Sequence, residues 1–354
     1  MSNKSNNNNE EKKSEQEVEK FQKDLDSAMT KRFYSSDTSS TDKSKEEKNN
    51  NDFLKYKSLR EFGYAYNDNG ELRSLENGEK FKFINQDHYD RFGYFVVREI
   101  QNKMLDKTKY KMREVKIPLD SEDPYKGNIF VSEDFEQNTG TLVMVICGSG
   151  QVKAGQWARS VCINDNLDNG SILPYLEKFN QLNYSSIVLN PNNNYYEVPL
   201  ELADDDPTLP KELPKQRQAI KGSESPLKHL FYIFDNIISK SPAKKFIIIA
   251  HSYGGVITSE LLDQRTDKLK DKLKLIALTD SVHSLSKKTT DYTRTFFDNS
   301  KKTRNWVRSD EPLGQDLGYS KIQGCQLYSS GHTVHEFTSG FCKSNLFEFI
   351  TENK

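Results

Sequence analysis

Three residues that could perform acyl-transfer chemistry follow one another along the chain in the order serine, aspartate, histidine. They are Ser252, Asp280 and His335. A serine hydroxyl is a weak nucleophile until a base removes its proton, and histidine is the base best suited to neutral pH. A carboxylate fixes the tautomer and orientation of the imidazole. The residue types therefore predict a nucleophile at Ser252, a base at His335 and an acid at Asp280.

Ser252 stands in a stretch with the pattern of a strand, a tight turn and a helix. Residues 246–250 are apolar or small, as in a strand buried on both faces, and a helical pattern begins directly after the serine. The small residues Ala250 and Gly254 keep strand and helix from colliding. This is the layout of the nucleophile elbow of the α/β-hydrolase fold, here as A-x-S-x-G. An ordinary strand–glycine–helix connection is the alternative.

A glycine-rich turn upstream of the elbow could bind a developing negative charge. It follows residues 142–146, which have the pattern of a buried strand. In α/β hydrolases such a turn supplies backbone N–H groups to the oxyanion hole, together with the residue after the nucleophile. A phosphate-binding loop is a rival interpretation, but the pattern G-x-x-x-x-G-K-[ST] is absent. We assign to the oxyanion pocket Gly148, Ser149, Gly150 and Tyr253.

Alternatives remain open for the acid, the base and the neighbouring histidines. Asp280 could instead cap a helix N-terminus, or it could pair with His283. His332 lies in the same loop as His335 and competes with it for the role of base. His251 is adjacent to the serine, so we interpret it as structural or as lining the pocket.

The elements that must position these residues alternate between strands and helices. Strand patterns cover residues 81–84, 114–118, 128–132, 142–146, 186–189, 246–250, 273–278 and 323–328. Helical patterns cover residues 88–105, 172–182, 227–238, 256–262 and the segment from 346, and residues 291–306 resemble a short helix and a turn. The alternation predicts an α/β-hydrolase-like α/β fold, with a mostly parallel sheet and helices on both faces. Such sheets bind ligands at the carboxyl ends of their strands, where the candidate residues fall.

Composition divides the chain into a tail and a domain. Residues 1–52 are rich in Asn, Ser, Lys and Glu, and contain too few apolar side chains to offset the entropy of ordering. We expect a disordered N-terminal tail, followed by a single domain over residues 53–354. Residues 197–225 carry prolines and charges, and we expect them to form a mobile insertion.

Charge and cysteine usage exclude several classes of function. The net charge of −1 predicts weak or no direct binding of RNA and no attraction to membranes. The four cysteines have no C-x-x-C spacing, so neither a zinc site nor another metal or cofactor is expected. The sequence lacks an apolar run of about 18 residues and an apolar signal-peptide core near its start. Cytoplasm or nucleus is the expected location.

Six stretches of the sequence are similar to a known family. They are CGSGQVKAGQWAR, VLNPNNNYYE, AHSYGGV, ALTDSVH, NWVRSDEPL and HEFTS. In this order they resemble the Argonaute-binding-protein-two domain family, whose animal members are cotranscriptional regulators. The resemblance extends over residues 59–352. Its H-E-[LF]-T-S motif falls on residues 335–339, which favours His335 over His332, and its nucleophile falls on Ser252. Where the family commonly has His before the glycine turn, this chain has Cys147.

The resemblance implies an α/β-hydrolase-like fold used at chromatin. Family members are associated with Argonaute proteins, small-RNA silencing and heterochromatin, and in animals with alternative splicing. Argonaute and chromatin-associated partners, in nucleus and cytoplasm, are therefore what the resemblance implies. Two functions follow: a regulatory protein that binds such partners, and an active serine hydrolase that acts on an ester, thioester or amide.

Overall fold

A nine-stranded sheet runs through the molecule, with β9 (Lys245–His251) in its middle. The computed structural model describes residues 51–119, 122, 126–196 and 218–353. The strand order is β12-β13-β11-β10-β9-β5-β6-β4-β3. The other strands of this sheet are β3 (Met112–Ile117), β4 (Gly127–Ser132), β5 (Thr141–Ile146), β6 (Ser185–Val188), β10 (Leu273–Thr279), β11 (Thr303–Val307), β12 (Asp316–Ser320) and β13 (Cys325–Ser329).

The central strands are parallel and the edges are antiparallel. Neighbours from β6 through β5, β9, β10 and β11 to β13 all pair in parallel. The pairs β3–β4, β4–β6 and β12–β13 are antiparallel. The predicted mostly parallel sheet is therefore confirmed.

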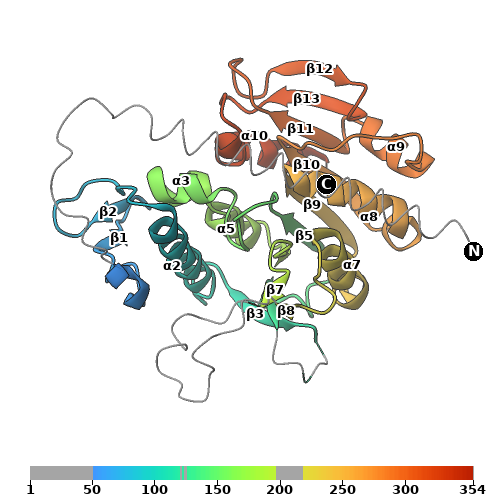
Figure 1. Cartoon of the computed structure of the whole chain (residues 1–354). Helices are drawn as coiled ribbons and strands as arrows, with labels where there is room; N and C mark the ends of the chain where they lie inside the picture. Colours follow the sequence, from blue (N-terminus) through green and yellow to red (C-terminus); the bar gives the residue numbers. More distant parts are fainter. Residues whose placement is uncertain (1–50, 120–121, 123–125, 197–217, 354) are drawn as a thin grey trace, which may run out of the picture.

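Helices cover both faces of the sheet, as predicted (Figure 1). One face is covered by α7 (Pro226–Asn236), α8 (Tyr253–Leu269) and α9 (Asp291–Asp298). The other face is covered by α2 (Gln86–Met104), α3 (Arg159–Asn164), α4 (Leu167–Gly170), α5 (Leu173–Gln181) and α10 (Thr338–Asn353). Short 3₁₀ turns are η1 (Asn51–Lys55), η2 (Ile238–Lys240) and η3 (His335–Phe337). No helix of the described residues is long and apolar enough to cross a membrane.

Side chains of β9 divide strictly between two cores. Ile247 and Ile249 pack with the core under α2, α5 and α10. Phe246, Ile248 and Ala250 pack with the core under α7, α8 and α9. Successive side chains of a strand point to opposite faces, so an unbroken apolar run is what a strand between two helical layers requires. This explains why the strand before Ser252 could be recognised from its sequence.

Two segments differ from the prediction. Residues 81–84 form no strand; the Phe81 ring instead stacks on Phe92, with 4.4 Å between ring centroids. The segment 291–306 is not only a helix and a turn, because its end forms β11, which lies between β10 and β13. The edge strand β12 also carried no clear sequence pattern, since most of it is exposed.

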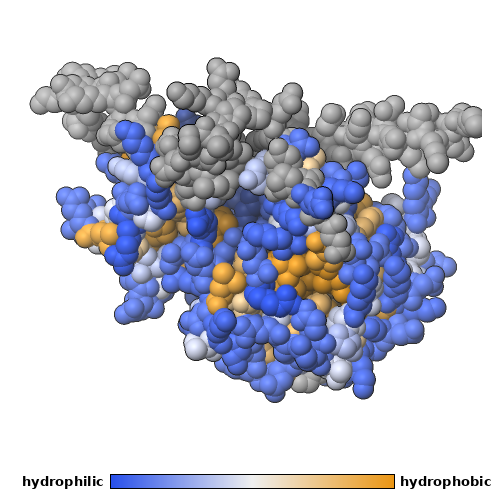
Figure 2. Space-filling view, turned by 90° about the horizontal axis from the view of Figure 1, so that it is seen from below, coloured by the Kyte–Doolittle hydropathy of each residue, from blue (hydrophilic) through white to orange (hydrophobic). Residues whose placement is uncertain are grey.

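Two small hairpins lie outside the main sheet. β1 (Tyr64–Tyr66) pairs with β2 (Leu72–Ser74) in antiparallel fashion. β7 (Tyr195–Tyr196) directly precedes the expected insertion at residues 197–225 and pairs with β8 (Gln218–Ala219), which lies within it. Residues 1–50 of the predicted tail at 1–52 and residues 197–217 of the predicted insertion lie outside the described residues. Seen from below, the surface is mainly hydrophilic and carries an apolar area between hydrophilic side chains (Figure 2).

Candidate active site

Ser252 occupies the sharp turn between β9 and α8. Its backbone has φ 53 and ψ −120, a conformation that non-glycine residues rarely adopt. The Ser252 N–H donates to the carbonyl of Thr279 at 3.0 Å, which ties the turn to the neighbouring strand β10. Strained backbone of this kind persists only where surrounding structure fixes it, and it is typical of functional sites. Only 5% of Ser252 is exposed.

Gly254 shows why the elbow needs a small residue two positions after the serine. A Cβ at Gly254 would lie 2.8 Å from the carbonyl oxygen of Ile146 and 2.9 Å from that of Cys147. Those are backbone atoms at the end of β5, and they cannot rotate away. Helix α8 therefore passes directly over the neighbouring strand, and a side chain at this position would push the two apart.

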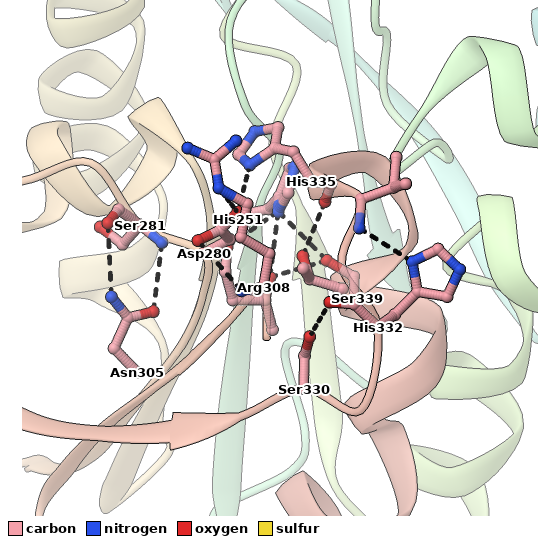
Figure 3. A network of polar contacts seen from close by, with 12 residues as sticks. His251, Asp280, Ser281, Asn305, Arg308, Ser330, His332, His335 and Ser339 are labelled. Atoms are coloured by element: carbon pink, nitrogen blue, oxygen red, sulfur yellow. Dashed lines mark hydrogen bonds and ion pairs between the residues drawn. The ribbon is translucent and has the colours of Figure 1, made fainter. Parts of the chain in front are cut away.

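The structure brings Asp280 and His335 together. Asp280 follows β10 and its N–H donates to the carbonyl of Trp306 at 2.7 Å, while His335 begins η3 after β13. His335 Nδ1 lies 2.7 Å from Asp280 Oδ2 (Figure 3). Both side chains are mostly buried, at 13% and 12% exposure. Residues from the ends of two different strands thus meet at the edge of the sheet where Ser252 lies.

The environment of Asp280 keeps its carboxylate charged. Burial raises its pKa, but the hydrogen bond from His335 and the charges of His335 and Arg308 outweigh burial, so the pKa lies below its ordinary value. Because a charged carboxylate only accepts hydrogen bonds, His335 must carry its proton on Nδ1. Its Nε2 is then the basic nitrogen. No hydrogen bond joins the side chains of Ser252 and His335 in the described structure.

The glycine turn after β5 packs against the nucleophile. A Cβ at Gly148 would lie 3.0 Å from the Cβ of Ser252 and 3.5 Å from its Oγ. Gly150 has φ 102, which side chains other than glycine seldom allow. Tyr253, the residue after the serine, starts α8 and so places its backbone N–H at a helix N-terminus. Gly148 and Tyr253, two of the residues predicted for an oxyanion pocket, therefore lie beside Ser252.

Two asparagines that the sequence reasoning missed hold this turn in place. Asn192 Nδ2 donates to the carbonyls of Gly148, at 2.7 Å, and Val152, at 2.9 Å. Asn190 Oδ1 accepts from the N–H of Ala154 at 2.9 Å. Their side chains bridge the loop after β6 to the turn after β5. Because asparagine is common in turns, the run N-P-N-N-N has no pattern of its own that would predict this bracing.

His251 lies behind the Asp280–His335 pair. Its Nδ1 is 2.8 Å from the carbonyl oxygen of Thr279 and 3.3 Å from Ser339 Oγ, and its ring centroid is 4.6 Å from that of His335. Burial, with a contribution from the charge of His335, lowers the His251 pKa to about 3. His251 therefore stays neutral and supports the His335 ring, in line with the structural role expected for it.

The competing histidines have other partners. His332 Nδ1 accepts from the N–H of Val334 at 3.0 Å, and its ring stacks on Phe337, on the side of the loop away from Asp280 (Figure 3). His283 lies 2.7 Å from Ser281 Oγ and 2.9 Å from the carbonyl of Gln323, through its two ring nitrogens. Neither ring contacts Asp280.

No group of three or more His, Cys, Asp and Glu side chains among the described residues is arranged to hold a metal ion. The cysteine before the glycine turn, Cys147, is fully buried, and burial raises the pKa of its thiol to about 12. It is therefore a packing residue and a poor nucleophile or metal ligand.

A polar cavity of about 630 Å³ lies next to the glycine turn. It is formed between α2, the strands β3 and β4, and the loop after β6. Gln151 and Lys153 of the turn are part of its wall, whereas Ser252, Asp280 and His335 are not. The cavity is thus a neighbour of the candidate active site.

The sequence matches the family model of the Arb2 domain over residues 56–313. The chain belongs to the Arb2 domain family. The resemblance inferred from its motifs is confirmed. The matched part of this Arb2 domain contains Ser252 and Asp280, and His335 follows it.

Relatives of this Arb2 domain cover most of its length. A "Cotranscriptional regulator ARB2A homolog" of Dictyostelium discoideum is 48% identical over 312 residues, which is 84% of this chain and 80% of the relative. The human "Cotranscriptional regulator ARB2A" is 33% identical over 343 residues, covering 83% and 80%. Among solved structures, a histone deacetylase from Saccharomyces cerevisiae aligns with a TM-score of 0.46 and 13% identity, over 77% of this chain and all of the other.

Proposed function

We propose that this protein is a cotranscriptional regulator that works through protein partners. The observation that carries this proposal is the 48% identity to a relative named as such, over 84% of the chain. Argonaute and chromatin-associated proteins are the proposed partners. Small-RNA silencing, heterochromatin and alternative splicing are the proposed processes, in nucleus and cytoplasm.

Affinity capture of the tagged full-length chain from its own cells tests this proposal. Argonaute and chromatin proteins should be recovered with the wild type and with Ser252→Ala in equal amounts, since a binding role does not need the hydroxyl. Replacement of an exposed apolar side chain, such as Ile322→Asp, tests whether capture depends on the surface; Ile322 is 72% exposed. Recovery of neither class of protein with the wild type would contradict the proposal.

A second function, that of a serine hydrolase, is favoured by the site. The supporting observation is the strained Ser252 turn beside the Asp280–His335 hydrogen bond of 2.7 Å. Serine, acid and histidine follow the order found in α/β hydrolases. We propose ester, thioester or amide substrates.

The proposed reaction has two halves, the acylation of Ser252 and the hydrolysis of the acyl-serine, and His335 acts as base and then as acid in each. Ser252 Oγ attacks the carbonyl carbon of the substrate while His335 Nε2 takes the hydroxyl proton. The tetrahedral oxyanion is bound by backbone N–H groups of the glycine turn and of Tyr253. As the bond to the leaving group breaks, His335 returns the proton to that group, which leaves an acyl-serine. A water then attacks in the same manner, so that the acid is released and Ser252 regains its proton.

Labelling with a fluorophosphonate probe tests the hydrolase proposal directly. The wild type should react, and Ser252→Ala should lose all labelling. Ser284→Ala is the matched control, because Ser284 is an exposed serine close in sequence to the acid. A folded wild-type protein that stays unlabelled would refute catalysis while leaving the regulatory proposal intact.

A further inference from the structure

An exposed arginine lies beside the acid of the candidate site. Arg308 directly follows β11, and its backbone N–H donates to Asp280 Oδ1 at 3.4 Å. Its Nε lies 4.0 Å from Asp280 Oδ2, and its side chain is 59% exposed. Figure 3 shows the Arg308 side chain running past Asp280 towards the imidazole rings. A partly exposed cation thus lies next to the buried pair.

The guanidinium of Arg308 is weakly engaged by the protein itself. Among the described residues its one charged neighbour is Asp280, at a distance too long for a hydrogen bond. Asp280 is already paired with His335. Asp310 and Glu311 follow Arg308 in the chain, but neither forms an ion pair with it. An arginine presents five N–H donors that suit a carboxylate or phosphate, so these donors can serve a ligand.

An exposed apolar residue contacts the backbone of the candidate nucleophile. Val282 donates its N–H to the carbonyl of Ser252 at 3.3 Å, yet 49% of Val282 is exposed. A large apolar side chain therefore reaches solvent directly beside the nucleophile. Binding sites for small molecules commonly combine an apolar wall with one charged group that fixes orientation. Val282, which is hydrogen-bonded to Ser252, and Arg308, which lies beside Asp280, offer this combination.

We propose that the site takes acyl substrates that carry a negative charge, and that Arg308 pairs with that charge. This proposal rests on the hydrolase function given above. Arg308 is a specificity residue, since it acts on binding and takes no part in proton transfer. If Arg308 merely supported the charge of Asp280, its loss would slow every substrate by the same factor. Selective loss of anionic substrates distinguishes the two roles.

Two nitrophenyl esters with acyl chains of equal length test the proposal. One is 4-nitrophenyl valerate, which is neutral, and the other is the 4-nitrophenyl monoester of glutarate, which is anionic. The wild type should have the higher kcat/KM for the glutarate ester. Arg308→Gln should lower the ratio of the two kcat/KM values by roughly 3- to 10-fold, as expected for a partly exposed ion pair. Arg308→Lys should keep most of the preference, and the exposed Arg60→Gln should keep all of it.

A binding measurement separates this proposal from the hydrolase function. Binding of the 4-nitrophenyl monoester of glutarate is measured by calorimetry to two variants, Ser252→Ala and the double variant that also carries Arg308→Gln. The single variant should bind more tightly, by the same roughly 3- to 10-fold. If the wild type turns over neither ester but this difference remains, catalysis fails and anion recognition stands. If esters are turned over and Arg308→Gln leaves the ratio unchanged, the hydrolase stands and our proposal is overturned. Equal binding by both variants overturns it as well.

Discussion

Two neighbouring residues of the loop after β10, Asp280 and Ser281, each bind a histidine, and the two histidines differ in exposure. Asp280 holds His335, which is 13% exposed in its side chain and is bonded through Nδ1 alone. Ser281, the next residue, holds His283, which is 1% exposed and bonded through both nitrogens. Burial lowers the His283 pKa to about 4. A polar neighbour alone therefore does not make a histidine a base. The histidine also needs a second ring nitrogen that makes no hydrogen bond within the protein and that a substrate can reach.

Removing the charge of Asp280 should have the largest effect, because it changes which nitrogen of His335 can accept the proton of Ser252. In Asp280→Asn, an amide N–H faces His335 and favours the tautomer in which Nε2 carries the proton. We expect labelling of Ser252 by a fluorophosphonate to slow by roughly 10³-fold. His283→Gln is the matched change in the other pair and should alter the labelling rate less than about twofold. Equal slowing in both variants would show that the two histidines do not differ in function.

Gly255 of α8 packs against Ser281. A methyl group at Gly255 should therefore disturb the loop that carries both Asp280 and Ser281. A Cβ at Gly255 would lie 1.9 Å from Ser281 Oγ and 2.7 Å from Ser281 Cβ. Gly255→Ala must therefore displace either α8 or the loop that carries Asp280 and Ser281. We expect a loss of about 2–3 kcal/mol in the free energy of unfolding, measured with denaturant. Ser281→Gly in the same chain should restore part of it, and a failure to restore any would place the clash elsewhere.

The smallest of these effects should appear in the pH dependence of the free energy of unfolding, where wild type is compared with His283→Gln. His283 has a folded pKa of about 4 and an ordinary value of 6.5. Its contribution is complete above the unfolded pKa and is lost as pH falls towards the folded pKa, because the unfolded chain then binds a proton that the folded one does not. Between pH 6 and 4.5, His283→Gln should make the fall in unfolding free energy shallower by roughly 1 kcal/mol per pH unit. An unchanged slope in denaturant titrations would contradict the assignment.

The strands and the elbow could be predicted because their residues are constrained by burial on both faces. The run from Phe246 to Ala250 has no other plausible place than between two cores, and the turn after it follows from the small residues. β12 could not be predicted in this way, since an exposed edge strand needs no apolar pattern. The strand predicted at residues 81–84 was wrong because Phe81 is buried by an aromatic cluster and not by a sheet.

The candidate site was predictable in its residue types more than in its contacts. The end of β10 suggested Asp280, but spacing could not decide between His332 and His335, which lie in one loop. The family motif favoured His335, and the folded loop shows that its ring is the one that meets Asp280. The bracing by Asn192 was also out of reach, because a side chain that bonds a loop 40 residues earlier leaves no local pattern.

The tie between Ser252 and β10 has a consequence for how the protein folds. The turn is held by the N–H of Ser252 on Thr279, and β9 is aligned by β5, in which Ile146 pairs with Ala250. Contacts between segments so far apart along the chain form slowly. The strained serine conformation can therefore appear only after the three strands have assembled. A probe that reacts with Ser252 during refolding would then report when β5, β9 and β10 have paired.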